Sequence, residues 1–168
     1  LSTATAIAAL ALVQRQNPNA TTHSVMIARG LKWLAKHQNA DGGWGDTVRS
    51  FSNISTSMLV RAAFHICDAV ADYPDTLSQA EQYLKRFGDT SETLSESVRK
   101  RYGKDRTFSV PILTMCALAK LVSWKEVPSL PFELACLPQS WYRFARLPVV
   151  SYALPALIAI GQCVYHHR

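Results

Sequence analysis

The sequence is most distinctive at residues 37–46, His37-Gln38-Asn39-Ala40-Asp41-Gly42-Gly43-Trp44-Gly45-Asp46. Asp-Gly-Gly is typical of a turn that ends a helix, because aspartate accepts local backbone hydrogen bonds and glycine tolerates a positive φ. We expect Trp44 to fold back onto the helix that has just ended. Gln38 can offer its amide to free backbone groups of a neighbouring helix end and stack on the indole. We therefore interpret the segment as a structural closure of a helix.

The stretch before this segment, Val25–Lys36, repeats its apolar residues with the period of an α-helix. The predicted apolar stripe consists of Val25, Ala28, Leu31, Trp33, Leu34 and Ala35, and the opposite face of Arg29, Lys32 and Lys36. This pattern predicts an amphipathic helix on the outside of the fold.

Apolar segments rich in small residues recur along the whole chain. They are Thr3–Val13, Ser55–Cys67, Ser109–Leu121 and Val149–Gly161, and amphipathic stretches such as Leu77–Phe87 lie between them. A helix that is apolar nearly all round is buried on both sides, and Ser55 is a suitable N-cap for the second segment. No run alternates with period two. The sequence thus predicts an all-α fold of inner and outer helix pairs, stacked as a solenoid or curled into an α/α barrel.

The outer segments carry a short internal repeat. Gly30-Leu31-Lys32-Trp33-Leu34 and Ala80-Glu81-Gln82-Tyr83-Leu84 superimpose at a spacing of 50 residues. Each has a small residue, two variable residues, an aromatic residue and a leucine, although the second copy is degenerate. The repeating unit is therefore expected to be one helix pair of about 50 residues.

Composition limits the class of protein. The chain has 168 residues, 48% of them hydrophobic and 18% charged, which excludes a disordered chain and fits one domain or part of one. The four cysteines, Cys67, Cys116, Cys136 and Cys163, lack C-x-x-C pairing, so we expect small buried hydrophobic residues and neither a disulfide framework nor a zinc site. The start lacks an initiator methionine and a signal-peptide pattern, which favours a segment of a longer protein.

The net charge of +6 does not point to nucleic acid. The most basic stretch, Lys85–Arg106, mixes acidic residues among the basic ones and reads as a solvated helix and loop. A nucleic-acid surface would gather its cations on one face with interleaved aromatic residues.

Taken together, Arg29-Gly30-Leu31-Lys32-Trp33-Leu34, Gln38, Gly42 and Trp44 resemble the QW repeat of the squalene–hopene and oxidosqualene cyclases. The structural motif on this chain would comprise Gly30, Trp33, Leu34, Gln38, Asp41, Gly42, Gly43 and Trp44. Further stretches resemble the order of the family's second domain: Arg101–Ser109, Trp124–Pro128, Leu130–Glu133 and Trp141–Phe144. The resemblance implies that residues 1–168 are a single α/α-barrel domain, or part of one, in a larger two-domain protein.

The resemblance also implies a mechanism. In this family an aspartate of a D-x-D-D motif protonates a terminal alkene or epoxide, and aromatic side chains stabilise the migrating carbocation. No D-x-D-D occurs here, and Asp72-Tyr73-Pro74-Asp75 has the wrong spacing and is expected in a surface turn. The family carries the acid on its other barrel domain. We therefore expect no catalytic residue in this segment, no cofactor and no metal, and an inactive isolated chain.

The C-terminal stretch Leu147–Tyr165 contains 19 residues without a charge. It could be a buried barrel helix, part of an apolar plateau inserted into a membrane, or a true span, although Pro148 and Pro155 interrupt it. The segment before it resembles the family's channel, where an aromatic residue narrows the passage from membrane to cavity. Leu147 stands where the hopene cyclases carry a tryptophan. Candidate cavity or channel residues are Trp141, Tyr142, Phe144, Leu147 and Tyr152, which could equally be packing aromatics and aliphatics.

The hypothesis is therefore a segment of a squalene–hopene-cyclase-like terpene cyclase that walls the cavity and carries the entrance facing the membrane. The implied partners are a hydrophobic isoprenoid or triterpene substrate, a membrane surface and the domain with the D-x-D-D motif, and a homodimer is allowed. The implied location is the cytoplasmic side of a membrane, with peripheral or monotopic attachment. Two alternatives stay open: a non-catalytic isoprenoid- or lipid-binding protein, and a prenyltransferase β-subunit-like protein. For the latter, His65, Cys67 and Asp68 are the only zinc candidates, and a core histidine is the simpler interpretation of His65.

Overall fold

The computed structural model describes residues 1–17, 22–103, 105–128, 136, 138–144 and 154–167. This part of the chain contains only helices, which confirms the all-α fold class. They are α1 (Ser2–Gln16), α2 (Thr22–Lys36), α3 (Ile54–Ile66), α4 (Pro74–Leu84), α5 (Ser91–Tyr102), α6 (Arg106–Leu118), the short 3-10 helix η1 (Trp124–Glu126), α7 (Gln139–Phe144) and α8 (Leu154–His167).

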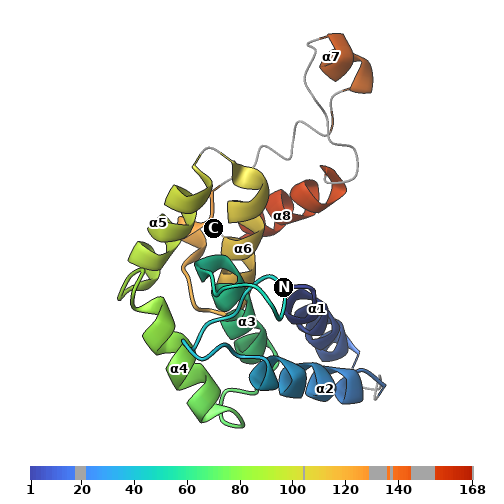
Figure 1. The fold of residues 1–168 in the computed structure, drawn as a ribbon. Helices are drawn as coiled ribbons and strands as arrows, with labels where there is room; N and C mark the ends of the chain where they lie inside the picture. The colour runs from blue at the N-terminus through green and yellow to red at the C-terminus, as the bar shows by residue number, and fades with distance from the viewer. Residues whose placement is uncertain (18–21, 104, 129–135, 137, 145–153, 168) are drawn as a thin grey trace.

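The helices form two layers. In the inner layer α1 packs on α3, α3 on α6, and α6 on α8. The outer helices α2, α4 and α5 pack on α1, α3 and α6 respectively, so that they lie along the outer side of the inner layer (Figure 1). The predicted inner and outer pairs are therefore present in the described residues. Closure of the layer into a barrel stays a prediction.

Local sequence explains where the central helices begin. Asn53 caps α3, because its side chain accepts a hydrogen bond of 2.9 Å from the N–H of Thr56. The prediction that Ser55 is the cap was therefore wrong by two residues. Thr90 and Thr93 form a reciprocal capping box at α5, and Asp105 caps α6. The solvated helix predicted within Lys85–Arg106 is α5.

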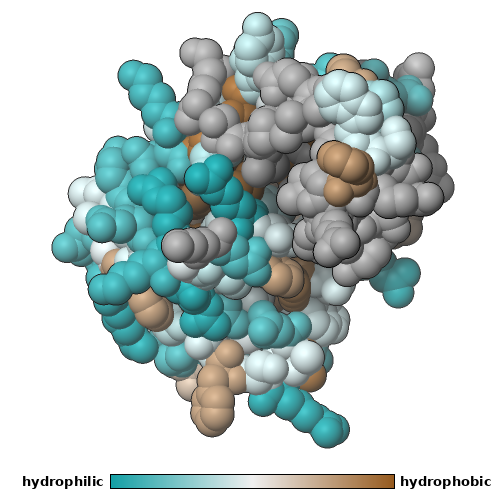
Figure 2. Space-filling view, turned by 90° about the horizontal axis from the view of Figure 1, so that it is seen from above, coloured by the Kyte–Doolittle hydropathy of each residue, from teal (hydrophilic) through white to brown (hydrophobic). Residues whose placement is uncertain are grey.

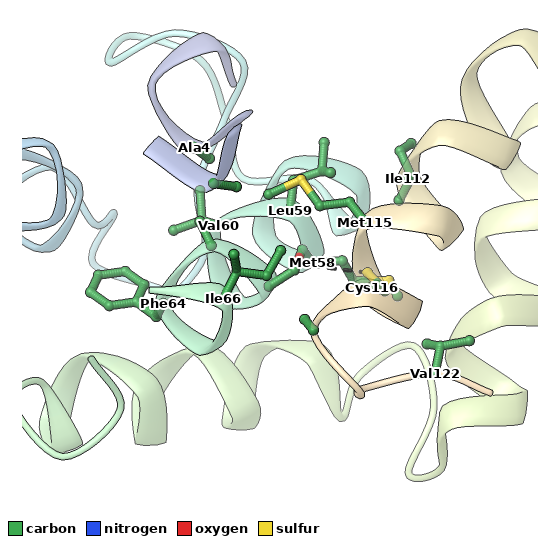
Figure 3. Close-up of a cluster of buried hydrophobic side chains, with 14 of the residues drawn as sticks. Ala4, Met58, Leu59, Val60, Phe64, Ile66, Ile112, Met115, Cys116 and Val122 are labelled. Atoms are coloured by element: carbon green, nitrogen blue, oxygen red, sulfur yellow. Dashed lines mark hydrogen bonds between the residues drawn. The ribbon is translucent and has the colours of Figure 1, made fainter. Parts of the chain in front are cut away.

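Burial separates the layers. Every side chain of α3 is buried except those of Arg61 and His65, whereas described residues on the face shown in Figure 2 are mainly hydrophilic, with isolated hydrophobic side chains among them. In the core, Met115 of α6 reaches Leu59 of α3, and Ala4 of α1 lies near Val60 (Figure 3). Burying such a side chain contributes about 1.5–3 kcal/mol, so α3 is the main source of cohesion.

The predicted stripe on α2 was partly wrong. Leu31 and Leu34 are buried, but Val25 is 61% and Trp33 42% exposed. The buried and half-buried face of α2 contains Ile27, Gly30, Leu31, Leu34 and Ala35, and Gly30 lies against Ile7 of α1. These positions follow the i, i+3, i+4, i+7 spacing of one helix face. Trp33 falls off that face.

One of the four cysteines also differs from the predicted burial. Cys116 is buried and Cys67 and Cys163 are half-buried, but Cys136 is exposed, so the prediction of four buried thiols was wrong at that position.

The helix α8 has 14 residues and buries Val164 while Tyr165 is 73% exposed. Among the described residues, no helix has both the length and the apolarity needed to cross a membrane.

Candidate functional site

The segment His37–Asp46, here called the closing loop, ends α2 as predicted. Trp44 is only 3% exposed, and its indole Nε1 donates a hydrogen bond of 2.9 Å to the carbonyl of Leu34 in the last turn of α2. Its backbone N–H donates to Ser57 Oγ of α3 at 3.0 Å. Since the last carbonyls of a helix have no intrahelical partner, the indole both fills the core and caps the helix.

Gln38 connects the closing loop to the next helix pair. Its Nε2 donates to the carbonyl of Gly42 at 2.8 Å and to the carbonyl of Thr76 in α4 at 2.9 Å. The predicted donation to the backbone of a neighbouring helix is confirmed, although the acceptor lies in the first turn of α4. Its stacking on the indole stays a prediction.

Two glycines allow the closing loop to lie directly on α4. Gly42 has a φ of +85°, and a Cβ at this position would collide with the carbonyl oxygen of Gln79. A Cβ at Gly43 would lie 2.9 Å from the ring of Tyr83. Residues other than glycine rarely adopt the φ of Gly42, and α4 leaves no room for a Cβ at either position. The Gly-Gly pair is therefore required for the contact between successive helix pairs.

Asp41 holds the turn. Its Oδ1 accepts hydrogen bonds from Ser52 Oγ at 2.6 Å and from the N–H of Gly43 at 3.0 Å. Burial opposes ionisation, but the hydrogen bonds from Ser52 and Gly43 prevail and lower the pKa of Asp41. Asp41 thus acts as the predicted local acceptor.

The helical part of the motif is divided between core and surface. Leu34 is 1% exposed, and a Cβ at Gly30 would collide with Ile7 of α1. Trp33 instead lies at the surface and stacks on His37, with ring centroids 4.2 Å apart. The indole that carries the closure is therefore Trp44.

The closing loop leads into a cavity at the N-terminal ends of α1, α3 and α6, here called the N-terminal pocket. Its volume is about 320 Å³, at the lower end of the range for small-molecule sites. It is lined by Leu1, Ser2, Thr5, Asp46, Ser55, Thr56, Leu59, Tyr102, Thr107, Phe108, Pro111, Ile112 and Met115. Most of this lining is apolar, and Figure 3 shows Leu59, Ile112 and Met115 on facing sides of α3 and α6.

Aromatic rings form one wall of the N-terminal pocket. Tyr102 and Phe108 stack with centroids 5.7 Å apart and an interplanar angle of 22°. The hydroxyl of Tyr102 donates to Ser55 Oγ at 2.9 Å, which fixes the ring against α3. Phe108 is 57% exposed. The wall therefore presents an aromatic surface to the pocket, and the Tyr102 hydroxyl at its inner side already has a hydrogen-bond partner.

The carboxylate of Asp46 lies at the rim of the N-terminal pocket. Oδ1 of Asp46 accepts hydrogen bonds from Thr56 Oγ1 at 2.6 Å and from Asn53 Nδ2 at 3.1 Å. The hydrogen bond from Thr56, followed by that from Asn53, lowers the pKa of Asp46. Asp46 is therefore ionised at neutral pH.

The opposite, C-terminal end of the inner layer is polar. A second cavity there is lined by Arg15, His65, Asp68 and Lys120 among others. Burial, and then the charge of Arg61, lowers the pKa of His65, which favours the neutral imidazole. Among the described residues, no three His, Cys, Asp or Glu side chains gather as a metal site.

Of the predicted cavity and channel residues, Trp141 and Phe144 are 62% and 91% exposed on α7, and neither lines the N-terminal pocket. Tyr142 belongs to α7, but its side chain lies outside the described part of the structure. Leu147 and Tyr152 also lie outside the described residues. Asp72 and Asp75 are exposed around the start of α4, as expected for a surface turn.

Sequence reasoning missed the residues that form the N-terminal pocket. Tyr102 and Phe108 stand in the stretch quoted for the resemblance, and Asp46 ends the closing loop. Their aromatic and acidic character was visible, but their convergence depends on the packing of α3 against α6.

Comparisons with known proteins agree with this architecture. Residues 2–65, which contain α1, α2, the closing loop and nearly all of α3, match the family model of the squalene-hopene cyclase C-terminal domain. Over 141 residues, 82% of this chain, the sequence is 30% identical to the squalene hopane cyclase afumA of Aspergillus fumigatus. Over 60 residues, 36% of this chain, it is 38% identical to the enfumafungin synthase efuA of Hormonema carpetanum.

These matches confirm the resemblance to the squalene–hopene cyclase family. The chain is a squalene–hopene-cyclase-like segment. It covers 16% of the length of the Aspergillus relative and 4% of that of the Hormonema relative. No solved structure matches it. In this cyclase-like segment the closing loop has a structural role, and the N-terminal pocket beside it is the candidate functional site.

Proposed function

We propose that this segment is part of a terpene cyclase that converts an acyclic triterpene into a polycycle by proton-initiated cyclisation. The observation that carries the proposal is the apolar N-terminal pocket, formed in part by the residues that match the family model. Leu59, Ile112 and Met115 offer a hydrocarbon chain contacts without hydrogen-bonding groups. The faces of Tyr102 and Phe108 can attract a cation by about 0.5–2 kcal/mol.

The acid that starts the reaction would come from another part of the protein. The 168 residues contain no D-x-D-D, and the lowered pKa of Asp46 makes this carboxyl a poor proton donor at neutral pH. The segment would supply cavity wall, and the 168 residues alone would be inactive. The proposed reaction uses no metal or organic cofactor.

The entrance for the substrate would face a membrane. Trp141 and Phe144 are exposed on α7, and aromatic residues at the surface favour the membrane–water interface. In the sequence, Arg143 and Arg146 precede the apolar C-terminal stretch, and their charges would suit anionic headgroups. Peripheral attachment on the cytoplasmic side is the proposed location, and a homodimer stays a prediction.

The test is turnover of squalene by the full-length protein, followed by gas chromatography and mass spectrometry of the products. We expect a polycyclic product. Phe108→Ala should lower turnover or change the product ratio by about twofold to tenfold, because it removes an aromatic face worth about 0.5–1.4 kcal/mol. Phe51→Ala is the matched control, because Phe51 is 96% exposed and does not line the pocket.

Two outcomes would contradict the proposal. Absence of any cyclised product from a folded full-length protein would reject the cyclase, and retained binding of squalene would then favour the non-catalytic isoprenoid-binding alternative. Equal turnover of Phe108→Ala and Phe51→Ala would show that the N-terminal pocket is not part of the proposed substrate cavity.

A further inference from the structure

We propose that a groove between α1, α2 and the end of α3 binds an alkylguanidinium group, which donates hydrogen bonds to Gln14 Oε1 and to the carboxylate of Asp72. This groove, here called the α1–α2 groove, has a volume of about 470 Å³ and lies at the opposite end of α1 and α3 from the N-terminal pocket. No described residue lines both cavities. The inference therefore goes beyond the proposed function and does not depend on it.

Gln14 supplies the α1–α2 groove with an acceptor that lacks a donor. Its Nε2 donates a hydrogen bond of 2.7 Å to Ser24 Oγ of the neighbouring α2 (Figure 1), which fixes the orientation of the side-chain amide. Its Oε1 is buried, and no described residue donates to it. Because a buried carbonyl oxygen without a donor is unfavourable, the groove favours a molecule that brings an N–H group to this atom.

The charged residues of the lining favour a cation. Arg15 is already paired, because its Nη2 donates to Asp68 Oδ2 at 2.7 Å. Asp72 forms no ion pair with any described residue. Since two carboxylates and one guanidinium line the groove, its net charge is negative. The carbonyl groups at the end of α3 add a partial negative charge.

The chain itself shows that a guanidinium suits this helix end. Besides its ion pair with Asp68, Arg15 donates at 2.6 Å to the carbonyl of Ile66 in the last turn of α3. A guanidinium is planar and carries five N–H donors, whereas an ammonium group is a compact point charge. Gln14 and Asp72 offer a second guanidinium the same combination of acceptors, one carbonyl oxygen and one carboxylate.

The apolar part of the lining suits an alkyl chain. It consists of small and aliphatic side chains of α1 and α2, which are Ala11, Ile27, Ala28 and Leu31. An alkyl chain that lies on them is removed from water, as the methylene groups of long cationic side chains are on apolar surfaces. The α1–α2 groove therefore favours a guanidinium on a short chain over the bare guanidinium ion.

The test titrates the full-length protein with butylguanidine and with two analogues that each lack one feature, and measures affinity by saturation-transfer NMR of the ligand. N-butylurea keeps N–H donors without the charge, and butyltrimethylammonium keeps the charge without the donors. Butylguanidine should bind about tenfold more tightly than butyltrimethylammonium, because only the former can donate to Gln14. It should bind about twofold to fivefold more tightly than N-butylurea, because Asp72 is exposed and its charge is screened.

Two variants with matched controls locate the group. Gln14→Met removes the acceptor and should weaken binding of butylguanidine by about tenfold, whereas Gln16→Met makes the same change on α1 outside the groove and should leave binding unchanged. Asp72→Asn should remove the advantage of butylguanidine over N-butylurea, and Asp75→Asn, which also lies outside the groove, should preserve it. Since Asp72 is exposed, its variant tests the inference even if Gln14→Met does not fold.

N-acetyl-L-arginine amide presents the same group on a peptide backbone. Tighter binding of this compound than of butylguanidine would favour an arginine side chain of a partner protein as the ligand, and the reverse order would favour a small molecule. Equal binding of butylguanidine and butyltrimethylammonium, equal effects of Gln14→Met and Gln16→Met, or no binding at all would overturn the inference and leave Gln14 Oε1 to water. None of these outcomes affects the test of squalene turnover, so the proposed function is judged separately.

Discussion

The helices α2 and α4 share a five-residue pattern but use its aromatic position differently. Their terminal leucines, Leu34 and Leu84, are each 1% exposed. Trp33 of α2 is 42% exposed, whereas Tyr83, at the same position of α4, is 4% exposed. The repeat therefore conserves the burial of the leucine in both units, while the aromatic residue of the helix is buried in one and exposed in the other.

The two helix ends explain this difference. At the end of α2, Trp44 returns from the closing loop and caps the carbonyl of Leu34. Both helix ends have the same backbone turn, because the N–H of His37 donates to the carbonyl of Leu34 at 3.2 Å and the N–H of Phe87 donates to that of Leu84 at 2.9 Å. The indole is therefore what the end of α2 has in addition. Where the loop supplies a tryptophan, the aromatic residue of the helix can lie at the surface. Where it does not, Tyr83 itself fills the space.

The same contact joins the two units, because Tyr83 lies against Gly43 of the closing loop and Gln38 donates to Thr76 of α4. The intact motif thus stabilises its own helix end and the helix pair that follows. The degenerate copy on α4 provides the surface that receives it.

The largest effect is expected at Trp44. Trp44→Ala should lower the free energy of unfolding by about 3–5 kcal/mol, because it leaves a cavity in the core and removes the hydrogen bond from the indole to the carbonyl of Leu34. Trp44→Phe keeps most of the volume and should cost less. Urea unfolding followed by circular dichroism measures both. A loss below about 1 kcal/mol for Trp44→Ala would show that the loop tryptophan does not support the core.

The next effect distinguishes the two aromatic positions of the repeat. Tyr83→Ala should cost about 3 kcal/mol, because this ring is buried. Trp33→Ala should cost less than about 1 kcal/mol, because this indole is partly exposed and stacks on His37 at the surface. The same unfolding experiment compares them. Equal losses would mean that the two copies use the position alike.

A smaller effect is expected at the turn. Gly42→Ala should cost about 1–3 kcal/mol, because alanine disfavours the φ of +85° and its Cβ would meet the carbonyl of Gln79. Gly103→Ala is the comparison, because Gly103 also has a positive φ but nothing within 4 Å of an added Cβ. If Gly42→Ala unfolds at the same urea concentration as the wild type, the loop does not require this close contact.

The smallest effect concerns the pH dependence of Asp46. Its pKa is lowered by hydrogen bonds in the folded state, so its contribution is complete above the pKa of the unfolded chain and is lost as the pH falls through the folded value. The stability difference between wild type and Asp46→Asn should be below about 1 kcal/mol at pH 7 and vanish under acidic conditions. Urea unfolding at pH 7 and pH 3 measures it. A difference that grows on acidification would contradict this role.

Much of the helical architecture could be predicted because its signals are local. Turn residues in the closing loop, and the apolar runs that became α1, α3 and α6, depend on nearby sequence. The burial of Trp33 was predicted wrongly, because helical period alone does not show which face a neighbouring helix approaches. Gly30 decided that, since it lets α2 approach Ile7 of α1.

The candidate site was less accessible to sequence reasoning. Tyr102, Phe108 and Asp46 come from three separate segments, and they line one pocket only because α3 packs against α6. The aromatic residues of Trp141–Phe144 were predicted to line the cavity or channel because this segment resembles the family's channel, but the described ones, Trp141 and Phe144, are exposed on α7.

The most direct test of the central claim, that the closing loop fastens one helix pair to the next and holds the start of α3 beside the pocket, is hydrogen exchange in Gln38→Ala. This variant removes the donation to Thr76 without opening a large cavity. We expect faster amide exchange in α4 and at the start of α3, with α1 unchanged. Faster exchange confined to residues 37–46 would contradict the claim.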